Sequence, residues 1–475
     1  MGSDVLIVGA GSAGCVLAER LTRDAACRVT IVDAGPGVAD PAVGAQIGNG
    51  LLLPIGAASS VVRRYRTTLT ERPRRSASIM RGEVVGGSGA VNGGYFCRGL
   101  PTDFDAWGLP GWTWDDVLPH FRDIETDLDF GGPLHGDVGP MRIRRVTEFD
   151  EGAAAFIDAA TGRGYSWVDD LNGEAAGRPG VGPVPLNIDG TRRVGPGQAF
   201  LGRAADRPNL TVVERTRVRR IHVANGSAVG VDVVGPGGPA RLTADRIVLS
   251  AGAIGSAHLL MLSGIGPAGQ LSAVGVAVVA DLPVGTRSID HPELVLPVDW
   301  PAGQGRPPLE ALLTTDRMLE IRCYTTGFNA MVGAPFDPSD RPHLGVTLMR
   351  PHSRGRVALA SADPAVPPVI EHRYDSVPRD VEALTEGAEL AHDLAGSGYH
   401  ARESYWSTSQ HLCSTVPMGP EGDAPLDERC RVRGVDGLWV VDGSILPDIT
   451  SRGPHATIVM IGHRAAEFIA RDAAS

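Results

Sequence analysis

Two histidines in the carboxyl-terminal part of the chain have the chemistry of a proton acceptor. His411 begins the stretch HLCSTVPMG, and His455 follows 44 residues later within RGPHATIVMIG. A neutral imidazole titrates near physiological pH, so it can take a proton from a weakly acidic hydroxyl group. A single histidine is more often a partly buried polar group without a catalytic role. The elements that must position these residues decide between the two interpretations.

The amino-terminal residues have the pattern of a dinucleotide-binding turn. Apolar residues predict strands at 4–8 and 29–32, and GAGSAG between them runs into an amphipathic helix. Gly9 permits a tight turn, Gly11 lets the backbone approach a pyrophosphate, and Gly14 lets the helix pack on the strand. The helix amino terminus then presents free N–H groups to the phosphates. We therefore predict cofactor contacts at Gly9, Gly11, Ser12, Ala13 and Gly14.

The second predicted strand ends in an acidic residue. Asp33 lies 19 residues after Gly14, where a carboxylate can accept hydrogen bonds from an adenosine ribose. Asp33, Ala34 and Gly35 offer no arginine for a 2′-phosphate, which disfavours NADP. This unit alone does not distinguish NAD from FAD.

A second glycine-rich loop follows at residues 82–99, GEVVGGSGAVNGGYFCRG. NAD enzymes need no second loop there. The stretch resembles the first signature of the glucose-methanol-choline (GMC) family of flavoenzymes, although Glu83 departs from it. The residues that fall at the family's spacing are Gly82, Val85, Gly86, Gly87, Ser88, Gly89, Val91, Asn92, Phe96, Gly99 and Asp105.

The resemblance extends along the whole chain. Residues 252–266, GAIGSAHLLMLSGIG, resemble the second signature, with Ala257 departing, and further similarity lies at 284–292, 350–370 and 437–462. The stretches LPIGAAS (53–59), GGSGAVNGGYFCR and HLCSTVPMGP most resemble the subgroup associated with mycofactocin, a peptide-derived redox cofactor.

The subgroup resemblance implies the reduced cofactor, mycofactocinol, as the alcohol substrate and a respiratory electron acceptor. Three alternatives stay open. The first is a small-alcohol or choline-type oxidase or dehydrogenase. The second is a lyase on the same fold with redox-silent FAD, and the third is a non-catalytic flavin-binding protein.

The family resemblance also implies how FAD is held. Some members attach FAD covalently through a histidine at the position of Val91, so non-covalent FAD is expected here. The adenine side would be lined by Val218 and Ala251, and the ribityl or pyrophosphate would meet Asp442 and Gly443. The pyrophosphate and flavin would lie along Arg81, Ser88, Asn92 and Gly93. Further cofactor contacts are expected at Asp33, Ala34, Gly86, Gly87, Gly252, His455 and Ala456.

The two histidines acquire roles through the same resemblance. HLCSTVPMG matches the family's H-x-x-G-T-x-x-M-G at His411, Thr415, Met418 and Gly419, while Ser414 departs. A second histidine or asparagine follows about 44 residues later in relatives, as His455 does here. Because asparagine cannot be a base, His411 is expected to take the hydroxyl proton as hydride moves to the N5 atom of the flavin. The second histidine would hold the substrate oxygen.

Two elements follow from the residue pattern. Helical spacing after His455 predicts a helix whose positive end favours an anionic reduced flavin. VVGPGGPARL at 233–242 predicts a hairpin turn.

The fold class implied is α/β (α+β overall), with a Rossmann-like FAD-binding domain and a second, antiparallel-sheet substrate domain. By resemblance both domains are discontinuous. The FAD-binding domain would comprise residues 1–145, 191–290 and 420–475, and the substrate domain 146–190 and 291–419.

Composition excludes several classes of protein. The 44 basic and 55 acidic residues give a net charge of −11, which argues against nucleic-acid binding. The sequence contains no lysine, which excludes Schiff-base enzymes and standard P-loops. The six cysteines have no metal-binding spacing, so neither a metal site nor a disulfide framework is expected.

The chain is expected to lie in the cytoplasm. Its amino terminus has no charged region with a cleavage site, and the apolar stretch from Ile247 is interrupted by glycines, serines and a histidine. That stretch predicts a buried strand-turn-helix rather than a transmembrane segment. The arginine-rich residues 63–81 predict a solvated strand-and-turn surface. Their alternative role is docking to an anionic partner or to the inner face of a membrane.

Overall fold

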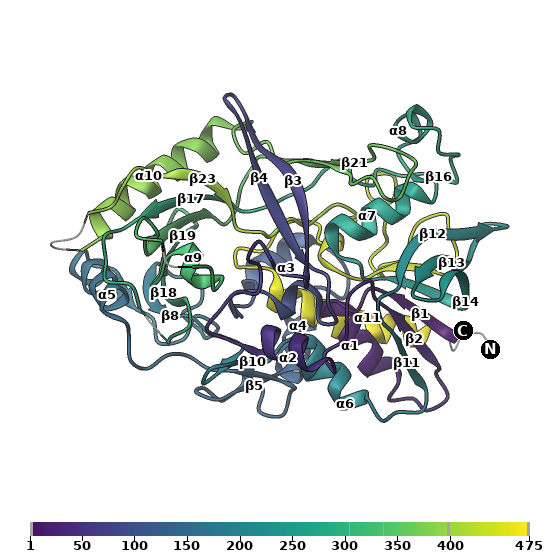
Figure 1. The fold of residues 1–475 in the computed structure, drawn as a ribbon, viewed down its shortest axis with the longest axis horizontal. Coiled ribbons are helices and arrows are strands. Elements are labelled where there is room, and N and C mark those ends of the chain that lie inside the picture. The colour runs from purple at the N-terminus through teal and green to yellow at the C-terminus, as the bar shows by residue number, and fades with distance from the viewer. Residues whose placement is uncertain (1–2, 304, 336, 397–399, 473–475) are drawn as a thin grey trace.

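The computed structural model describes residues 3–303, 305–335, 337–396 and 400–472. Two seven-stranded sheets organise these residues. Figure 1 shows the sheet that contains β1 (Ser3–Val8) on the right and the sheet that contains β17 (Pro292–Pro297) on the left. The functional cavity lies between them.

The first sheet has the strand order β11-β2-β1-β14-β13-β12, and β24 pairs with β14. Pairing is parallel from β11 to β14 and between β14 and β24, whereas β12, β13 and β14 form an antiparallel meander. The other strands are β2 (Val29–Val32), β11 (Leu210–Val213), β12 (Arg217–Ala224), β13 (Ser227–Gly235), β14 (Gly238–Leu249) and β24 (Leu438–Val440).

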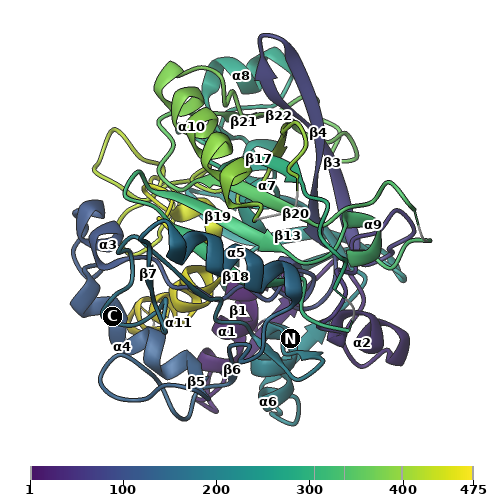
Figure 2. The same cartoon turned by 90° about the vertical axis from the view of Figure 1, so that its left-hand side faces the viewer.

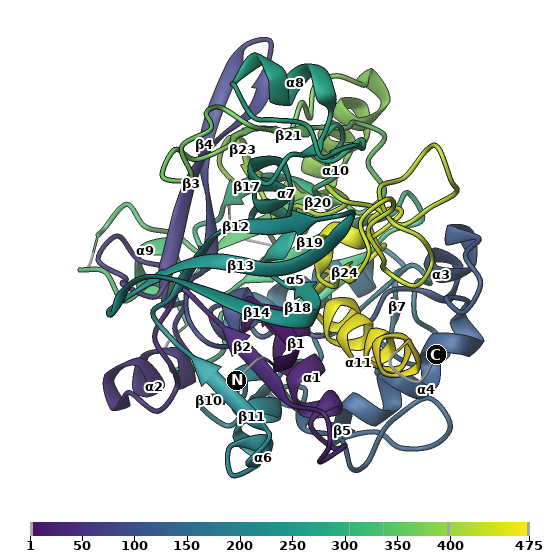
Figure 3. The same cartoon turned by 90° about the vertical axis from the view of Figure 1, so that its right-hand side faces the viewer.

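Two helices cover one face of the parallel strands. Figure 3 shows α1 (Ser12–Leu21) beside α11 (His455–Arg471). A Cβ on Gly462 would lie 2.8 Å from the carbonyl oxygen of Ala13, so a glycine is needed for this close approach of the two helices. The core beneath them is largely apolar, and residues 5–8 of β1 are buried, as parallel strands usually are.

The second sheet has the strand order β23-β17-β20-β19-β18-β8-β7, antiparallel except for the last pair. Its strands alternate between two environments. Leu294, Leu296 and Ile321 face an apolar core formed with α5 and α10, and the intervening residues face the cavity. Figure 2 shows α5 and α10 beside this sheet. The elements are α5 (Glu151–Gly162), α10 (Pro378–Leu394), β7 (Ser166–Trp167), β8 (Gly180–Pro183), β18 (Leu309–Thr314), β19 (Leu319–Tyr324), β20 (His343–Leu348) and β23 (Tyr405–Thr408).

A long hairpin of β3 (Val62–Glu71) and β4 (Arg74–Gly82) projects from the molecule in Figure 1. Distant strands β21 (Arg356–Ala358) and β22 (Val369–Glu371) extend it to a four-stranded sheet. Its arginines are largely exposed, which confirms the predicted strand-and-turn surface at 63–81.

Shorter elements connect these layers. They are α2 (Pro41–Gly48), η1 (Gly87–Ala90), α3 (Pro101–Trp107), α4 (Trp114–Ile124), β5 (Glu125–Asp127), β6 (Met141–Ile143), β9 (Ile188–Asp189), β10 (Arg192–Arg193), η2 (Gly197–Leu201), α6 (Gly202–Ala204), α7 (Gly252–Leu262), β15 (Ile265–Gly266), α8 (Ala268–Ala273), β16 (Ala280–Asp281), α9 (Phe328–Met331) and η3 (Gly443–Ile445). Among the helices of the described ranges, none combines the length and the apolar character that crossing a bilayer requires.

The predicted α/β fold with a second, antiparallel sheet is confirmed. The predicted strands, the hairpin at 233–242 and the helix from His455 all occur, and the stretch from Ile247 is a strand, a turn and α7. The domain boundaries stay a prediction. The strands of the second sheet lie within 146–190 and 291–419, whereas β21 and β22, from 356–371, join the amino-terminal hairpin instead.

Candidate active site

A single elongated cavity of about 690 Å³ runs from the first turn of α1 to the second sheet. Its volume falls within the range of cavities that bind cofactors and small ligands. Glycine-rich loops line one end, and side chains of β17, β19 and β20 line the other, which we call the substrate end. The two predicted catalytic histidines line the same cavity.

The glycine-rich end has the shape of a phosphate cradle. Gly9 has φ +101°, and a Cβ on it would lie 2.5 Å from the carbonyl oxygen of Ser250, so only glycine fits this turn. A Cβ on Gly87 would lie 2.7 Å from the Cα of Gly11, so the two loops touch through their backbones. Helix α1 has no side-chain cap, which leaves the N–H groups of its first turn free for an anion.

Asp33, the residue predicted to contact the adenosine ribose, lies in the wall of the cavity. Its carboxylate accepts hydrogen bonds from the backbone amides of Ala10 at 2.8 Å and Gly35 at 2.7 Å, and it lines the cavity. Burial raises the pKa of Asp33 to about 6, although the two amide hydrogen bonds oppose that rise. Carboxylate oxygens have further lone pairs for ribose hydroxyl groups. These features fit the adenosine end of FAD.

Most predicted cofactor residues line this cavity. They are Gly9, Gly11, Ser12, Ala13, Asp33, Ala34, Arg81, Gly87, Ser88, Asn92, Gly93, Val218, Ala251, Gly252, Asp442, Gly443 and His455. Three others lie behind its wall: Gly14, Gly86 and Ala456.

The three residues behind the wall shape the loops. A Cβ on Gly14 would lie 2.1 Å from the carbonyl oxygen of Gly9, as expected for a helix packed against its turn. Gly86 has φ +102° and donates its amide to the carbonyl of Ala10 at 2.7 Å. Ala456 is fully buried in the first turn of α11.

Asp442 joins the carboxyl-terminal segment to α7. Its carboxylate accepts hydrogen bonds from the amide of Gly252 at 2.9 Å, the hydroxyl of Ser256 at 2.5 Å and the amide of Ser444 at 2.8 Å. Burial raises the pKa of Asp442, and these hydrogen bonds oppose the rise. The carboxylate therefore fixes the backbone beside the cofactor end of the cavity.

His411 is half-buried and is held by a fully buried histidine, His291. The two Nδ1 atoms lie 2.9 Å apart, and the rings are nearly perpendicular at 87°. The Nε2 atom of His291 lies 3.0 Å from the carbonyl oxygen of Thr450, which can only accept, so Nε2 carries the proton. Burial lowers the pKa of His291 to about 4, so the ring is neutral and its Nδ1 has a lone pair.

This lone pair decides the tautomer of His411. Its Nδ1 must donate to His291, which leaves its Nε2 without a proton. Burial lowers the pKa of His411 well below its usual value, and neighbouring His291, Arg322 and Arg81 act in the same direction. His411 therefore has the protonation state of a base.

His455 has the opposite tautomer. The Oδ1 atom of Asn92 accepts a hydrogen bond from the amide of Gly94 at 2.9 Å, and its Nδ2 lies 3.0 Å from Nδ1 of His455. Since Nδ2 can only donate, His455 carries its proton on Nε2. This Nε2 is buried, and burial lowers the pKa of the ring to about 4 although a backbone group of Tyr95 opposes that fall.

Glycines make room for both rings. A Cβ on Gly89 would lie 2.6 Å from Nε2 of His455, the first residue of α11. A Cβ on Gly453 would lie 3.3 Å from Cε1 of His411, so the backbone two residues before His455 contacts the other histidine. Segments 44 residues apart in the sequence thus meet at one wall of the cavity.

Sequence reasoning missed the residues of the substrate end and the role of His291. Glu293, Arg322, Tyr324, Met331 and His343 line this end, and the rings of Tyr324 and His343 stack at 4.7 Å. The alternation of polar and apolar residues at 291–294 was a usable signal, because it places His291 and Glu293 on one face of a strand.

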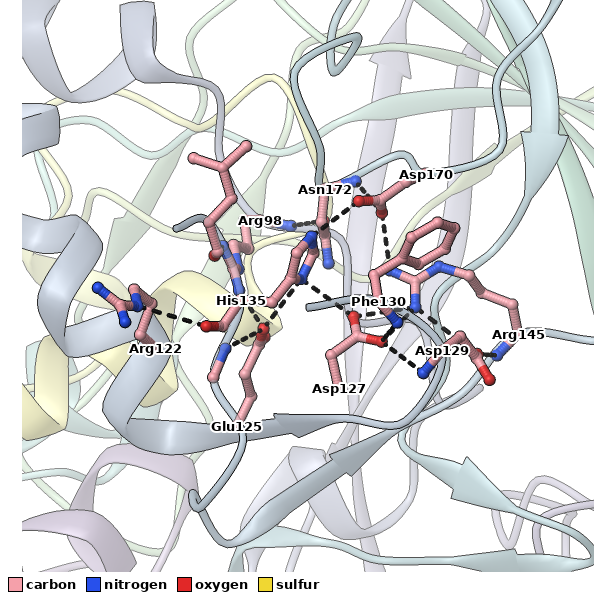
Figure 4. A network of polar contacts seen from close by, with 12 residues as sticks. Arg98, Arg122, Glu125, Asp127, Asp129, Phe130, His135, Arg145, Asp170 and Asn172 are labelled. Carbon is pink, nitrogen blue, oxygen red and sulfur yellow. Dashed lines mark hydrogen bonds and ion pairs between the residues drawn. The ribbon is translucent and has the colours of Figure 1, made fainter. Parts of the chain in front are cut away.

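A second buried ionic cluster lies outside the cavity. Figure 4 shows His135 between three carboxylates, with Nδ1 3.4 Å from Glu125 and 3.2 Å from Asp127, and Nε2 2.8 Å from Asp170. Burial opposes the charged imidazolium, but hydrogen bonds to these carboxylates outweigh it and raise the pKa of His135 to about 10.

Two guanidinium groups neutralise the same carboxylates. Arg98 pairs with Glu125, and Arg145 pairs with Asp127 at 2.8 Å and Asp170 at 2.7 Å. A group of carboxylates and a histidine can hold a metal ion. Here two arginines and a protonated histidine already pair with those carboxylates, so we interpret the cluster as an ionic network that joins β5 to the loop at 170.

Models of protein families match most of the chain. The amino-terminal model of the GMC oxidoreductases matches residues 3–293, and the carboxyl-terminal model matches residues 351–462. Among curated relatives, an uncharacterized GMC-type oxidoreductase in the thcA 5′ region of Rhodococcus erythropolis is 40% identical over 99% of both chains. The oxygen-dependent choline dehydrogenase of Photobacterium profundum is 30% identical over 98% of this chain and 92% of its own.

Solved structures agree with this assignment. Pyridoxine 4-oxidase from Mesorbium loti is 30% identical and superposes with a TM-score of 0.89, covering 98% of this chain and 99% of its own. Formate oxidase of Aspergillus oryzae is 25% identical, with a TM-score of 0.88 over 99% and 98% of the two chains. The chain therefore belongs to the GMC oxidoreductase family and is an FAD-dependent oxidoreductase of alcohol-type substrates.

Proposed function

We propose that this protein oxidises a CH–OH group with His411 as the base and His455 as the hydrogen-bond donor to the substrate oxygen. Bound FAD supplies the hydride acceptor, the N5 atom of its flavin ring. The single observation that carries the proposal is the pair of opposite tautomers, a bare Nε2 on His411 and an N–H on His455, in one cavity.

The two tautomers have different roles toward the alcohol: one accepts its proton and the other donates a hydrogen bond to its oxygen. An alcohol is a very weak acid, so its proton must leave as the hydride leaves, and the lone pair of His411 accepts it. The N–H of His455 donates to the same oxygen and so orients the carbon toward the flavin. After proton transfer His411 is an imidazolium, and the acceptor nitrogen of His291 stabilises its Nδ1–H.

Anaerobic reduction of the flavin tests this proposal. Mixing the holoenzyme with a suitable alcohol should bleach the flavin absorbance, and His411→Ala should slow bleaching about 10²- to 10⁴-fold, as expected for loss of a general base. Retention of the wild-type bleaching rate by that variant would refute the role of His411. Mycofactocinol and a panel of simple alcohols should be compared in the same assay.

The alternative activities give different results in the same experiment. A small-alcohol or choline-type oxidase would form stoichiometric hydrogen peroxide in air, whereas a dehydrogenase would need another acceptor. A lyase would turn over while its flavin stays oxidised. A non-catalytic flavin protein would do neither.

Mycofactocinol is the substrate that we propose, with electrons passing from FAD to a respiratory acceptor. Support comes from the LPIGAAS stretch, because Leu53 and Ile55 from it line the cavity. The relative from Rhodococcus erythropolis at 40% identity is itself uncharacterized. Faster bleaching by mycofactocinol than by every simple alcohol is the expected result.

Contact with a membrane-bound acceptor would use the β3–β4 hairpin. Its exposed arginines at 64, 66, 72, 74 and 75 form a basic projection on an acidic protein. Such a projection favours anionic surfaces. We therefore propose a cytoplasmic protein that contacts the inner face of the membrane peripherally, and co-sedimentation with anionic vesicles is the test.

The FAD should be dissociable. Val91 lies in the wall of the cavity and has no nucleophilic atom to form a bond with the flavin. Acid precipitation of the holoenzyme should leave all of the yellow cofactor in the supernatant. A flavin that co-precipitates with the protein would contradict this proposal.

A further inference from the structure

We propose that Arg322 makes the substrate end electrically neutral and thereby restricts the enzyme to uncharged alcohols, excluding quaternary ammonium alcohols such as choline. This inference rests on the proposed alcohol oxidation and names the class of substrate for it. It concerns residues for which sequence reasoning predicted no role.

Among the described residues that line the substrate end, Glu293 carries the carboxylate that could attract a cation. The side chain is buried, with Oε2 2.5 Å from the Ser409 hydroxyl that donates to it. A Cβ on Gly345 would lie 2.6 Å from Oε1, so the glycine provides the space that this carboxylate fills. An unpaired carboxylate here would be an obvious counter-ion for a positively charged substrate.

Arg322 removes that attraction. Its Nη1 lies 3.8 Å from Oε2 of Glu293 and 3.2 Å from the hydroxyl oxygen of Ser409. Both Glu293 and Arg322 line the cavity, and they come from β17 and β19, whose cavity-facing residues they are. Burial raises the pKa of Glu293, while Arg322 lowers it.

A second ion pair completes the charge balance. Nη2 of Arg322 lies 2.9 Å from Oε2 of Glu320, and Nη1 of Arg452 lies 2.7 Å from Oε1 of the same carboxylate. Burial opposes the charge on Glu320, but the two arginines outweigh it and lower its pKa. Two buried carboxylates and two buried guanidinium groups therefore sum to zero.

A further pair of opposite charges lies near His411. Arg81 lies in the wall of the cavity, and Asp290 behind His411 accepts hydrogen bonds from the hydroxyls of Tyr374 and Thr408. The negative charge of Asp290 acts to raise the pKa of Arg81, whereas burial lowers it. A cationic substrate would thus lose its hydration without gaining an unpaired anion.

The rest of the substrate end suits an uncharged group. Leu309, Met331 and Val295 provide apolar contacts, and the stacked rings of Tyr324 and His343 form a flat wall. Burial lowers the pKa of His343 to about 4, so this ring carries no charge. An aromatic wall can attract a cation, but the guanidinium of Arg322 at the same end opposes it.

Two alcohols of the same shape test the inference, namely choline and its neutral isostere 3,3-dimethylbutan-1-ol. Dissociation constants for the holoenzyme would be measured anaerobically at pH 8, from the concentration dependence of the bleaching rate for an alcohol that reduces the flavin and from the shift of the flavin absorption spectrum for one that does not. The wild type should bind the neutral alcohol at least tenfold more tightly, a difference of about 1.4 kcal/mol.

Variants that change the net charge of the substrate end should shift the ratio of the two dissociation constants in the direction of that charge. Arg322→Met leaves one uncompensated carboxylate and should move the ratio at least tenfold toward choline. Glu293→Gln leaves one uncompensated arginine and should move it away from choline. The double variant restores neutrality and should return to the wild-type ratio, which separates charge from shape.

The outcomes distinguish this inference from the proposed function. Tighter binding of choline by the wild type, or a ratio that does not follow net charge across the variants, would overturn the role of Arg322. Absence of flavin bleaching with every alcohol would refute the proposed oxidation and leave the binding ratios still interpretable. Glu293→Gln is nearly isosteric, so it keeps the test open if Arg322→Met fails to fold.

Discussion

The hydrogen bond between His411 and His291 allows a quantitative prediction. Replacing His291 by leucine removes the acceptor of the Nδ1–H of His411, which lies 2.9 Å away on a fully buried ring, whereas His411 itself is half-buried. The imidazole of His411 then either buries an unsatisfied donor or changes tautomer and loses the lone pair on Nε2. In both cases the base is less available to the substrate hydroxyl.

The magnitude follows from the burial of that donor. A buried donor without a partner costs about 1–3 kcal/mol. If this cost is borne by the active tautomer, flavin reduction slows about 5- to 150-fold. His291→Ala should slow it less, because a water molecule can enter the space and accept the hydrogen bond.

A conservative variant distinguishes positioning from general damage. His291→Asn offers an oxygen to His411 and an amide to the carbonyl of Thr450, so it should recover most of the rate. Stopped-flow reduction of the holoenzyme under anaerobic conditions measures all three variants. His463→Leu is the matched control, because it removes another buried imidazole, paired with His120 at 2.8 Å and outside the cavity.

The control should lower thermal stability and leave reduction within about twofold of wild type. A rate within about twofold of wild type for His291→Leu as well would refute the tautomer argument, since it leaves a buried donor unpaired. A slow His291→Asn variant would show instead that the imidazole itself is required.

Two further predictions concern His455 and His135. His455→Ala should slow flavin reduction about 10- to 100-fold through loss of its N–H donor, whereas His455→Asn keeps a donor and should lose less; equal losses in stopped-flow traces would argue against a donor role. The pKa of His135 in the folded state is raised to about 10. The stability that its imidazolium contributes to the fold is therefore fully present below about pH 6.5 and is lost as the pH rises through 10. At pH 6 the wild type should be more stable than His135→Leu by a free energy of unfolding on the order of 3 kcal/mol, seen as a higher melting temperature. This difference in melting temperature should disappear near pH 10. A difference that does not change with pH would exclude an imidazolium.

Local sequence determined the elements of the cofactor end. The turn at Gly9, the helix that follows and Asp33 at the end of β2 are specified by residues within one short segment, because tight turns and helix starts depend on neighbours in the chain. For the same reason the start of α11 at His455 follows from helical spacing alone. The second glycine-rich loop then distinguished FAD from NAD, but only through resemblance to a family.

Only the tertiary structure decided which groups meet in the active site. His291 and His411 are 120 residues apart, and antiparallel pairing of β17 with β23 brings their segments together. Arg322 reaches Glu293 because β19 and β17 both flank β20, so their cavity-facing residues share one side of a sheet. Tautomers and net charge depend on such contacts between distant segments, since a hydrogen bond or an ion pair is set by distance in space and by burial, neither of which a residue pattern specifies.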